Sequence, residues 1–214
     1  MVRAVPRPEA PFLPVSNPPL VAVPPLAPPV DDEAELCRRI GAGDDRAFEL
    51  LVERYQHRIY AFCARLLGDR AEAEDVAQEV FLTLYRNAGD FRGESTFATW
   101  LYRIAKNQAL NRIKYLDRRG RKQRSRDELG TPDGPDAPES RPDALAEGGQ
   151  TAALVQEAIG ELEAEHRAVL VLRDLEDLSY EEIAAATGLP IGTVKSRIHR
   201  GRSALATRLA RFFR

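Results

Sequence analysis

The chain has 214 residues, which is room for one or two small domains. Hydrophobic residues make up 43% and charged residues 30%, the mean hydropathy is -0.38, and no apolar run reaches the roughly 18 residues of a membrane span, so the composition excludes membrane insertion. The net charge of -2 argues against a uniformly basic nucleic-acid binder, but this sum hides a strong local segregation of charge.

Cysteine usage limits the chemistry further. Cys37 and Cys63 are too few for a disulfide framework and have no metal-ligand spacing, so we expect both to be buried apolar side chains. Prolines interrupt every apolar stretch near the N-terminus, so no secretory signal is predicted and the expected location is the cytoplasm. We expect no cofactor and no metal site.

Residues 1–30 contain ten of the fifteen prolines and almost no charge. This composition is typical of a disordered, polyproline-like tail rather than a packed element. The simplest interpretation is a solvated tether, and the alternative is a docking segment for a regulatory partner.

Residues 31–116 predict a helical bundle. Asp44 and Asp45 stand where a helix N-cap is expected, apolar residues then recur every three or four positions, and Gly68 ends the pattern. The same spacing predicts a second helix from about residue 71 to 87 and a third that begins after Ser95 as its N-cap. No strand alternation interrupts these helices, so the fold class is all-α.

Residues 117–150 lose this periodicity. Their first part is basic, and residues 127–150 hold seven acids and four prolines, a composition that cannot build a core. We therefore expect a flexible linker between two small helical domains, the second of which spans residues 151–214.

The second domain contains a helix-turn-helix pattern. A capping box of Ser179 and Glu182 opens a short helix, a turn with a glycine follows, and Pro190 can start the second helix. Residues 183–214 carry seven basic residues and no acid, whereas residues 151–182 carry nine acids and two arginines. This polarity favours DNA binding by the last helix.

A helical wheel turns Val194 and Ile198 of that helix inward, so the opposite face could enter a major groove. Lys195 or Arg200 would read a guanine edge, and rim arginines would contact phosphate. For His199 a surface role is the simpler interpretation. The candidate residues are Thr193, Lys195, Ser196, Arg197, His199, Arg200 and Arg202.

The stretch 91–115 interleaves aromatic side chains with cations and asparagines. Aromatic platforms stack unpaired bases, cations follow the backbone, and amides read exposed base edges. The alternative is an ordinary amphipathic helix, and we expect Trp100 to be largely core. The candidates for single-stranded DNA are Phe91, Arg103, Lys106, Asn107, Asn111, Arg112 and Lys114.

The second predicted helix is acidic around Asp75 and Glu79. It lacks a histidine and the regular oxygen-ligand spacing of a calcium loop. A protein interface is therefore a better interpretation of this helix than a metal site.

Four motifs in order carry a family resemblance: DVAQEVF at 75–81, FRGESTFATWL at 91–101, LSYEEIA at 178–184 and GTVKSR at 192–197. They resemble bacterial RNA polymerase sigma factors of the extracytoplasmic-function (ECF) group of the sigma-70 family. The resemblance spans about residues 35–117 and 151–210. That group keeps only sigma regions 2 and 4, which agrees with two helical domains and a short chain.

The resemblance implies how the two domains divide the work. Region 2, residues 31–116, would bind core RNA polymerase, and it would recognise and melt the minus-ten promoter element through the candidates in 91–115. Region 4 would read the minus-thirty-five element with the last helix. The partners implied are the beta-prime and beta subunits, promoter DNA and an anti-sigma factor. The residues implied to dock on the clamp helices of beta-prime are Asp75, Gln78, Glu79 and Leu82.

Two alternatives remain at this point. A stand-alone helix-turn-helix regulator shares the pattern of the last domain, but it would need a receiver or ligand domain, which residues 31–116 do not resemble. A nucleic-acid enzyme would need a nucleophile with its base or a ligand cluster, and the three histidines are scattered.

The two promoter elements lie about 80 Å apart at ~3.4 Å per base pair, so a sigma factor would need residues 117–150 extended.

Overall fold

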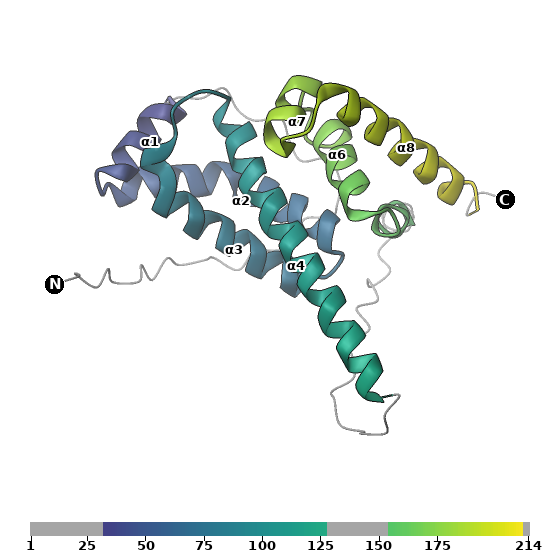
Figure 1. The fold of residues 1–214 in the computed structure, drawn as a ribbon. Coiled ribbons are helices and arrows are strands. Elements are labelled where there is room, and N and C mark those ends of the chain that lie inside the picture. Colours follow the sequence, from purple (N-terminus) through teal and green to yellow (C-terminus); the bar gives the residue numbers. More distant parts are fainter. Residues whose placement is uncertain (1–31, 128–153, 212–214) are drawn as a thin grey trace, which may run out of the picture.

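The computed structural model describes residues 32–127 and 154–211, and within these ranges every regular element is a helix (Figure 1). The elements of the first domain are α1 (Glu33–Gly41), α2 (Asp45–Leu67), α3 (Arg70–Asn87), the short 3-10 helix η1 (Ala88–Asp90) and α4 (Phe97–Asp127). In the second domain, residues 154–160 are helical and are followed by α6 (Ala164–Asp174), α7 (Tyr180–Thr187) and α8 (Ile191–Leu209). The all-α fold class is confirmed, and the proline-rich tail lies outside the described residues.

Local signals set the ends of the helices. The Asp44 side chain accepts hydrogen bonds from the N–H groups of Arg46 and Ala47, and Gly68 ends α2 in the left-handed conformation with φ 76°. In the second domain, the predicted capping box of Ser179 and Glu182 is present at the start of α7. These side chains satisfy N–H groups that have no partner inside a helix.

One predicted cap is wrong by a residue. α4 begins at Phe97, and the hydroxyl of Thr96 accepts the N–H of Thr99 at 3.2 Å, so Thr96 rather than Ser95 is the N-cap. Ser95 instead donates to the carbonyl of Thr96 at 3.3 Å. Both residues are good caps, and the choice depends on loop geometry that sequence spacing does not specify.

The core of the first domain is apolar and contains several edge-to-face aromatic pairs. The rings of Phe62 and Tyr102 lie 5.3 Å apart and those of Tyr55 and Phe97 lie 5.1 Å apart. Such pairs add about 0.5–1.5 kcal/mol to the area that they bury. Trp100 is 8% exposed, as expected for a core residue.

One close backbone contact inside this domain depends on glycine. A Cβ on Gly41, the last residue of α1, would lie 3.0 Å from the Cα of Gly89 in η1, so these backbones meet where no side chain fits. Cys37 and Cys63 are buried, as predicted, and burial raises the pKa of each thiol to about 12.

The boundary predicted at residue 117 is wrong. α4 continues without a break to Asp127, so the basic part of the expected linker is helical. Arginine, lysine and glutamine are good helix formers, and a helix already nucleated by a packed domain extends at low cost. Apolar periodicity could not reveal this extension, because an exposed helix needs no apolar face.

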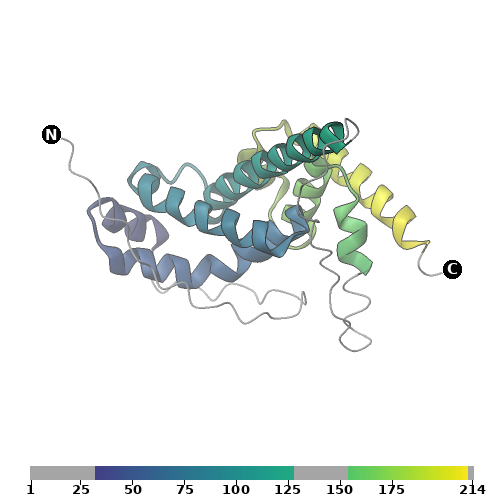
Figure 2. The same ribbon diagram turned by 90° about the horizontal axis from the view of Figure 1, so that it is seen from below.

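The second domain packs against the first. Figure 1 and the perpendicular view in Figure 2 both place α6 and α7 beside α4 and the end of α2. The sequence predicted two domains but not this contact between them.

Candidate nucleic-acid interface

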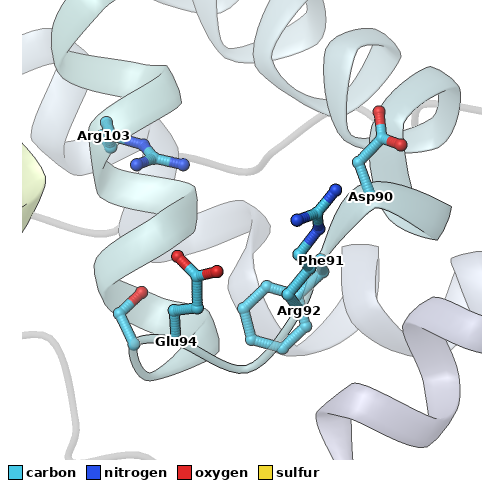
Figure 3. A pocket seen from close by; sticks show the side chains of 6 residues that line it. Asp90, Phe91, Arg92, Glu94 and Arg103 are labelled. Atoms are coloured by element: carbon cyan, nitrogen blue, oxygen red, sulfur yellow. The ribbon is translucent and has the colours of Figure 1, made fainter.

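A surface pocket of about 250 Å³ lies where the loop after η1 meets α4, and its lining is Asp90, Phe91, Arg92, Glu94, Ser95 and Arg103. Figure 3 shows Arg103 of α4 and Glu94 of the loop pointing toward the same hollow. Phe91 packs on the ring of Trp100 at 5.4 Å, so the core fixes the position of this aromatic wall. An aromatic surface beside hydrogen-bonding groups has the chemistry to hold an unstacked base.

A polar stripe on α4 leads away from this pocket. Arg103, Asn107, Asn111 and Lys114 are all exposed and follow one another at spacings of four, four and three residues. With 3.6 residues per turn these positions share one face of the helix. The structure therefore brings four of the seven candidates for single-stranded DNA into one line, and Phe91 sits in the adjoining pocket.

The other two candidates of that set lie off the stripe. Lys106 is half-buried against the second domain, where its ammonium lies 3.5 Å from the carbonyl of Thr187 and burial lowers its pKa. Arg112 faces α3 and binds the carboxylates of Glu72 and Glu79, the latter at 2.8 Å. In this conformation both cations are engaged by protein groups.

The acidic face of α3 is solvent-accessible. Asp75, Glu79 and Leu82 are exposed and Gln78 is half-buried, and 45% of Leu82 is accessible, unusually much for a large apolar residue. A single exposed leucine does not by itself mark a binding surface, so the interface assignment of this face stays a prediction. Because Arg112 lies 3.8 Å from Asp75, α4 helps to hold this acidic face.

The helix-turn-helix has the predicted geometry. Gly188 takes a left-handed conformation with φ 72° between α7 and α8, and Val194 and Ile198 are buried. The opposite face of α8 exposes Lys195, Ser196, His199 and Arg200, as the wheel predicted. Thr193 is half-buried, and its carbonyl accepts the hydroxyl of Ser196 at 3.0 Å.

Acids of α6 hold the two rim arginines of α8. Arg197 pairs with Glu165 at 2.6 Å, and Arg202 bonds Asp174 at 3.0 Å. These pairs orient the guanidinium groups beside the recognition face. They also explain why a domain with many acids can present a basic last helix.

The sequence did not reveal a buried ionic cluster between the two domains. Glu176, in the loop between α6 and α7, has a fully buried side chain that contacts Arg58 at 3.1 Å and Arg65 at 3.6 Å, both on α2. The Tyr102 hydroxyl of α4 donates to the same carboxylate. The available signal was Arg65, a charged residue among the apolar positions of α2, with Arg58 seven residues before it.

The charges in this cluster compensate one another. Burial raises the pKa of the Glu176 carboxyl, while the hydrogen bond from Tyr102 and the charge of Arg58 oppose that rise. Burial lowers the pKa of Arg65, and the charge of Glu176 acts in the other direction. A carboxylate shared by two arginines and a phenol avoids most of the cost of an isolated buried charge.

Taken together, these surfaces define a two-domain helical protein with side chains suited to binding nucleic acid. Among residues 32–127 and 154–211 no group of three metal-ligating side chains comes together. None of the helices in that part of the chain is long and apolar enough to cross a membrane.

Comparison with known proteins places the chain in a family. The Sigma-70 region 2 family matches residues 51–119 and the Sigma-70 region 4 family matches residues 152–205. RNA polymerase sigma-H factor of Pseudomonas aeruginosa is 41% identical over 82% of this chain and 92% of its own length. ECF RNA polymerase sigma-E factor of Escherichia coli K12 is 41% identical over 79% of this chain and 90% of its own length. The chain belongs to the sigma-70 family and is similar to its ECF group.

Solved structures agree with this assignment. CnrH in complex with the cytosolic domain of CnrY has a TM-score of 0.61 and 25% identity, covering 84% of this chain and 98% of that one. The sigma factor RpoE from Bartonella quintana, in complex with the anti-sigma factor NepR, has a TM-score of 0.56 and 25% identity, covering 76% and 96%. The protein is thus an alternative sigma factor that directs transcription to promoters, and the stand-alone regulator is not favoured, because residues 51–119 match region 2.

Proposed function

We propose that this protein binds core RNA polymerase through the acidic face of α3 and recognises the minus-ten and minus-thirty-five elements through α4 and α8. The observation that carries the proposal is the exposed stripe on α4 that adjoins the pocket at Phe91. Membership of the sigma-70 family supports it, and the cytoplasm, where polymerase and DNA meet, is the expected location.

Minus-ten recognition would use the pocket and the stripe together. A base that leaves the duplex would stack against Phe91, while Arg103 would neutralise a phosphate next to it. Asn107 and Asn111 each offer a donor and an acceptor to an exposed base edge. Lys114 at the end of the stripe would bind the backbone.

Minus-thirty-five recognition would use the exposed face of α8. Lys195 and Arg200 are accessible for a guanine edge, which is worth about 1–3 kcal/mol of discrimination per base. Arg197 and Arg202, oriented by α6, would bind phosphates on either side, with Ser196 and His199 adding contacts.

The domains would have to separate on the promoter. The ammonium of Lys106 on α4 lies 3.5 Å from the carbonyl of Thr187 at the end of α7, so the two proposed DNA-binding domains are in contact. The two elements are about 80 Å apart on straight DNA at ~3.4 Å per base pair. The packed arrangement described above is therefore the form of the protein away from the promoter, and opening would also release Lys106 for DNA.

The implied partners also include an anti-sigma factor. CnrH and the B. quintana RpoE are each described in complex with a partner, the cytosolic domain of CnrY and the anti-sigma factor NepR. We infer that a partner of this kind binds the present protein and competes with polymerase for the same surface. Exposed Leu82 on α3 is the apolar position most suited to this shared surface.

Run-off transcription from a promoter library, with purified core polymerase, tests the proposal. Specific transcripts that appear only when the protein is added would support it. We expect Asp75→Arg to abolish holoenzyme assembly and Arg200→Ala to preserve assembly while relaxing minus-thirty-five selectivity. Equal loss of core binding in both variants would contradict the assigned roles, and a shift of duplex DNA without any transcript would favour a stand-alone regulator.

A further inference from the structure

The C-terminal part of α4 extends past the ends of α2 and α3, as Figure 1 shows. In the described side chains of this extension, Arg118, Arg119 and Arg121 are all exposed. An exposed basic segment is often only a solvated helix face. The positions of these arginines around the helix decide whether they can act together with the polar stripe as a binding surface.

Arg118 and Arg121 continue the polar stripe that begins at the pocket. At 100° per residue, Arg103, Lys114, Arg118 and Arg121 all lie within about 40° of Asn107 around the helix axis. Arg119 lies about 120° away from Asn107 on the same helix. The stripe from position 103 to 121 is about 27 Å long at 1.5 Å per residue, and the part beyond Lys114 adds about 10 Å.

The charge on this face is uniformly positive beyond Asn111. Between Asn111 and Arg121 the one acid is Asp117, which is exposed and whose carbonyl accepts the Nε–H of Arg121 at 3.3 Å. Arg118 donates its Nε–H to the carbonyl of Lys114 at 3.1 Å, which lays the side chain along the helix and uses one of the five donors of a guanidinium.

We propose that Arg118 and Arg121 bind phosphates of promoter DNA next to the minus-ten element, so that α4 grips the DNA beyond the bases it reads. This inference rests on the proposed function, because it takes Asn107 and Asn111 as the reading residues. The added 10 Å corresponds to about three base pairs at ~3.4 Å each. The contact is independent of sequence, because phosphate contacts position a protein on DNA without reading its bases.

The test uses holoenzyme formed from core polymerase and the full chain. The variant Arg118→Gln/Arg121→Gln is compared with Arg119→Gln, which removes an exposed charge from the same helix but from a different face. Binding is measured on promoter fragments that either end at the edge of the minus-ten element or continue four or more base pairs beyond it on each side, over a series of salt concentrations.

We expect the double variant to lose affinity only on a fragment that continues beyond the element, and the slope of log affinity against log salt to fall by about 2, one for each phosphate contact. Arg119→Gln should match wild type on every fragment. Equal binding of all three proteins, or equal loss on short and long fragments, would overturn the inference. Weaker assembly of the double variant with core polymerase in the absence of DNA would also overturn it, because the surface would then contact polymerase.

The two proposals fail in different ways. If wild-type holoenzyme shows no promoter-specific binding, the proposed function fails. If wild type binds specifically and the arginine variants do not differ from it, only the extension of the DNA contact fails.

Discussion

The interior of the first domain and the contact between the two domains are both buried and share one apolar core, but the contact between domains also holds a buried ionic cluster. The interior consists of apolar and aromatic side chains such as Leu51 and Phe62. The contact between domains adds Glu176, Arg58 and Arg65 to this apolar cluster, with weaker polar contacts such as Gln156 to the carbonyl of Ala64 at 3.4 Å. Exposing the first to water is costly, whereas ionic groups of the second regain hydration when they separate.

The largest effect should come from the interior. Leu51→Ala removes a fully buried side chain from α2, and we expect it to cost about 2–5 kcal/mol of the free energy of unfolding. Urea denaturation followed by far-ultraviolet circular dichroism measures this loss. Leu82→Ala, at an exposed position on α3, is the matched control, and a similar loss in both would show that the first domain lacks a specific core.

Glu176→Ala should separate the domains. It leaves two arginines without their shared acceptor, which would cost about 3–5 kcal/mol if the domains stayed packed, and opening avoids that cost by hydrating both guanidinium groups. Small-angle X-ray scattering should show a larger radius of gyration, with the unfolding of the first domain unchanged. Glu181→Ala, exposed on α7, is the control, and an unchanged radius in Glu176→Ala would refute the role of this cluster.

A smaller effect should come from the backbone contact between α1 and η1. Gly41→Ala places a methyl group 3.0 Å from the Cα of Gly89, a backbone atom that cannot rotate away, so we expect a loss of about 1–3 kcal/mol in the free energy of unfolding. Gly120→Ala, in the exposed part of α4 with open space around it, should instead stabilise its helix by about 0.5–1 kcal/mol. Thermal unfolding of both variants checks the opposite signs.

The smallest effect should come from an exposed ion pair. Arg202→Ala breaks the contact with Asp174, in which the two side chains are 52% and 32% accessible, and should change stability by only about 0.2–1 kcal/mol. Denaturant unfolding measures this difference. A loss as large as that expected for Leu51→Ala would mean that the exposure of this ion pair does not predict how much it contributes to stability.

The sequence predicted best those features that depend on neighbouring residues. Asp44, Gly68 and the Ser179 capping box act within a few positions of the helix ends that they define, and the inward turn of Val194 follows from helix period alone. The recognition face of α8 was predictable for the same reason. The pairing of these surfaces with particular DNA positions and with polymerase stays a prediction.

The features that the sequence did not predict depend on distant residues or on the absence of a signal. Glu176 meets Arg58 across 118 positions of chain, and no local pattern encodes that contact. The continuation of α4 to Asp127 carries no apolar periodicity, although its residues are good helix formers. The choice of Thr96 over Ser95 as cap depends on the path of the preceding loop, in which Gly93 has φ 70°.

The two buried thiols give this molecule an internal reporter. Burial raises the pKa of the Cys37 and Cys63 thiols well above their usual range, which disfavours the reactive thiolate, and both side chains are buried. Loss of this core would expose both thiols to alkylation, so a maleimide reports its unfolding. In the folded chain, a cysteine introduced at the surface can be labelled without competition from the native pair.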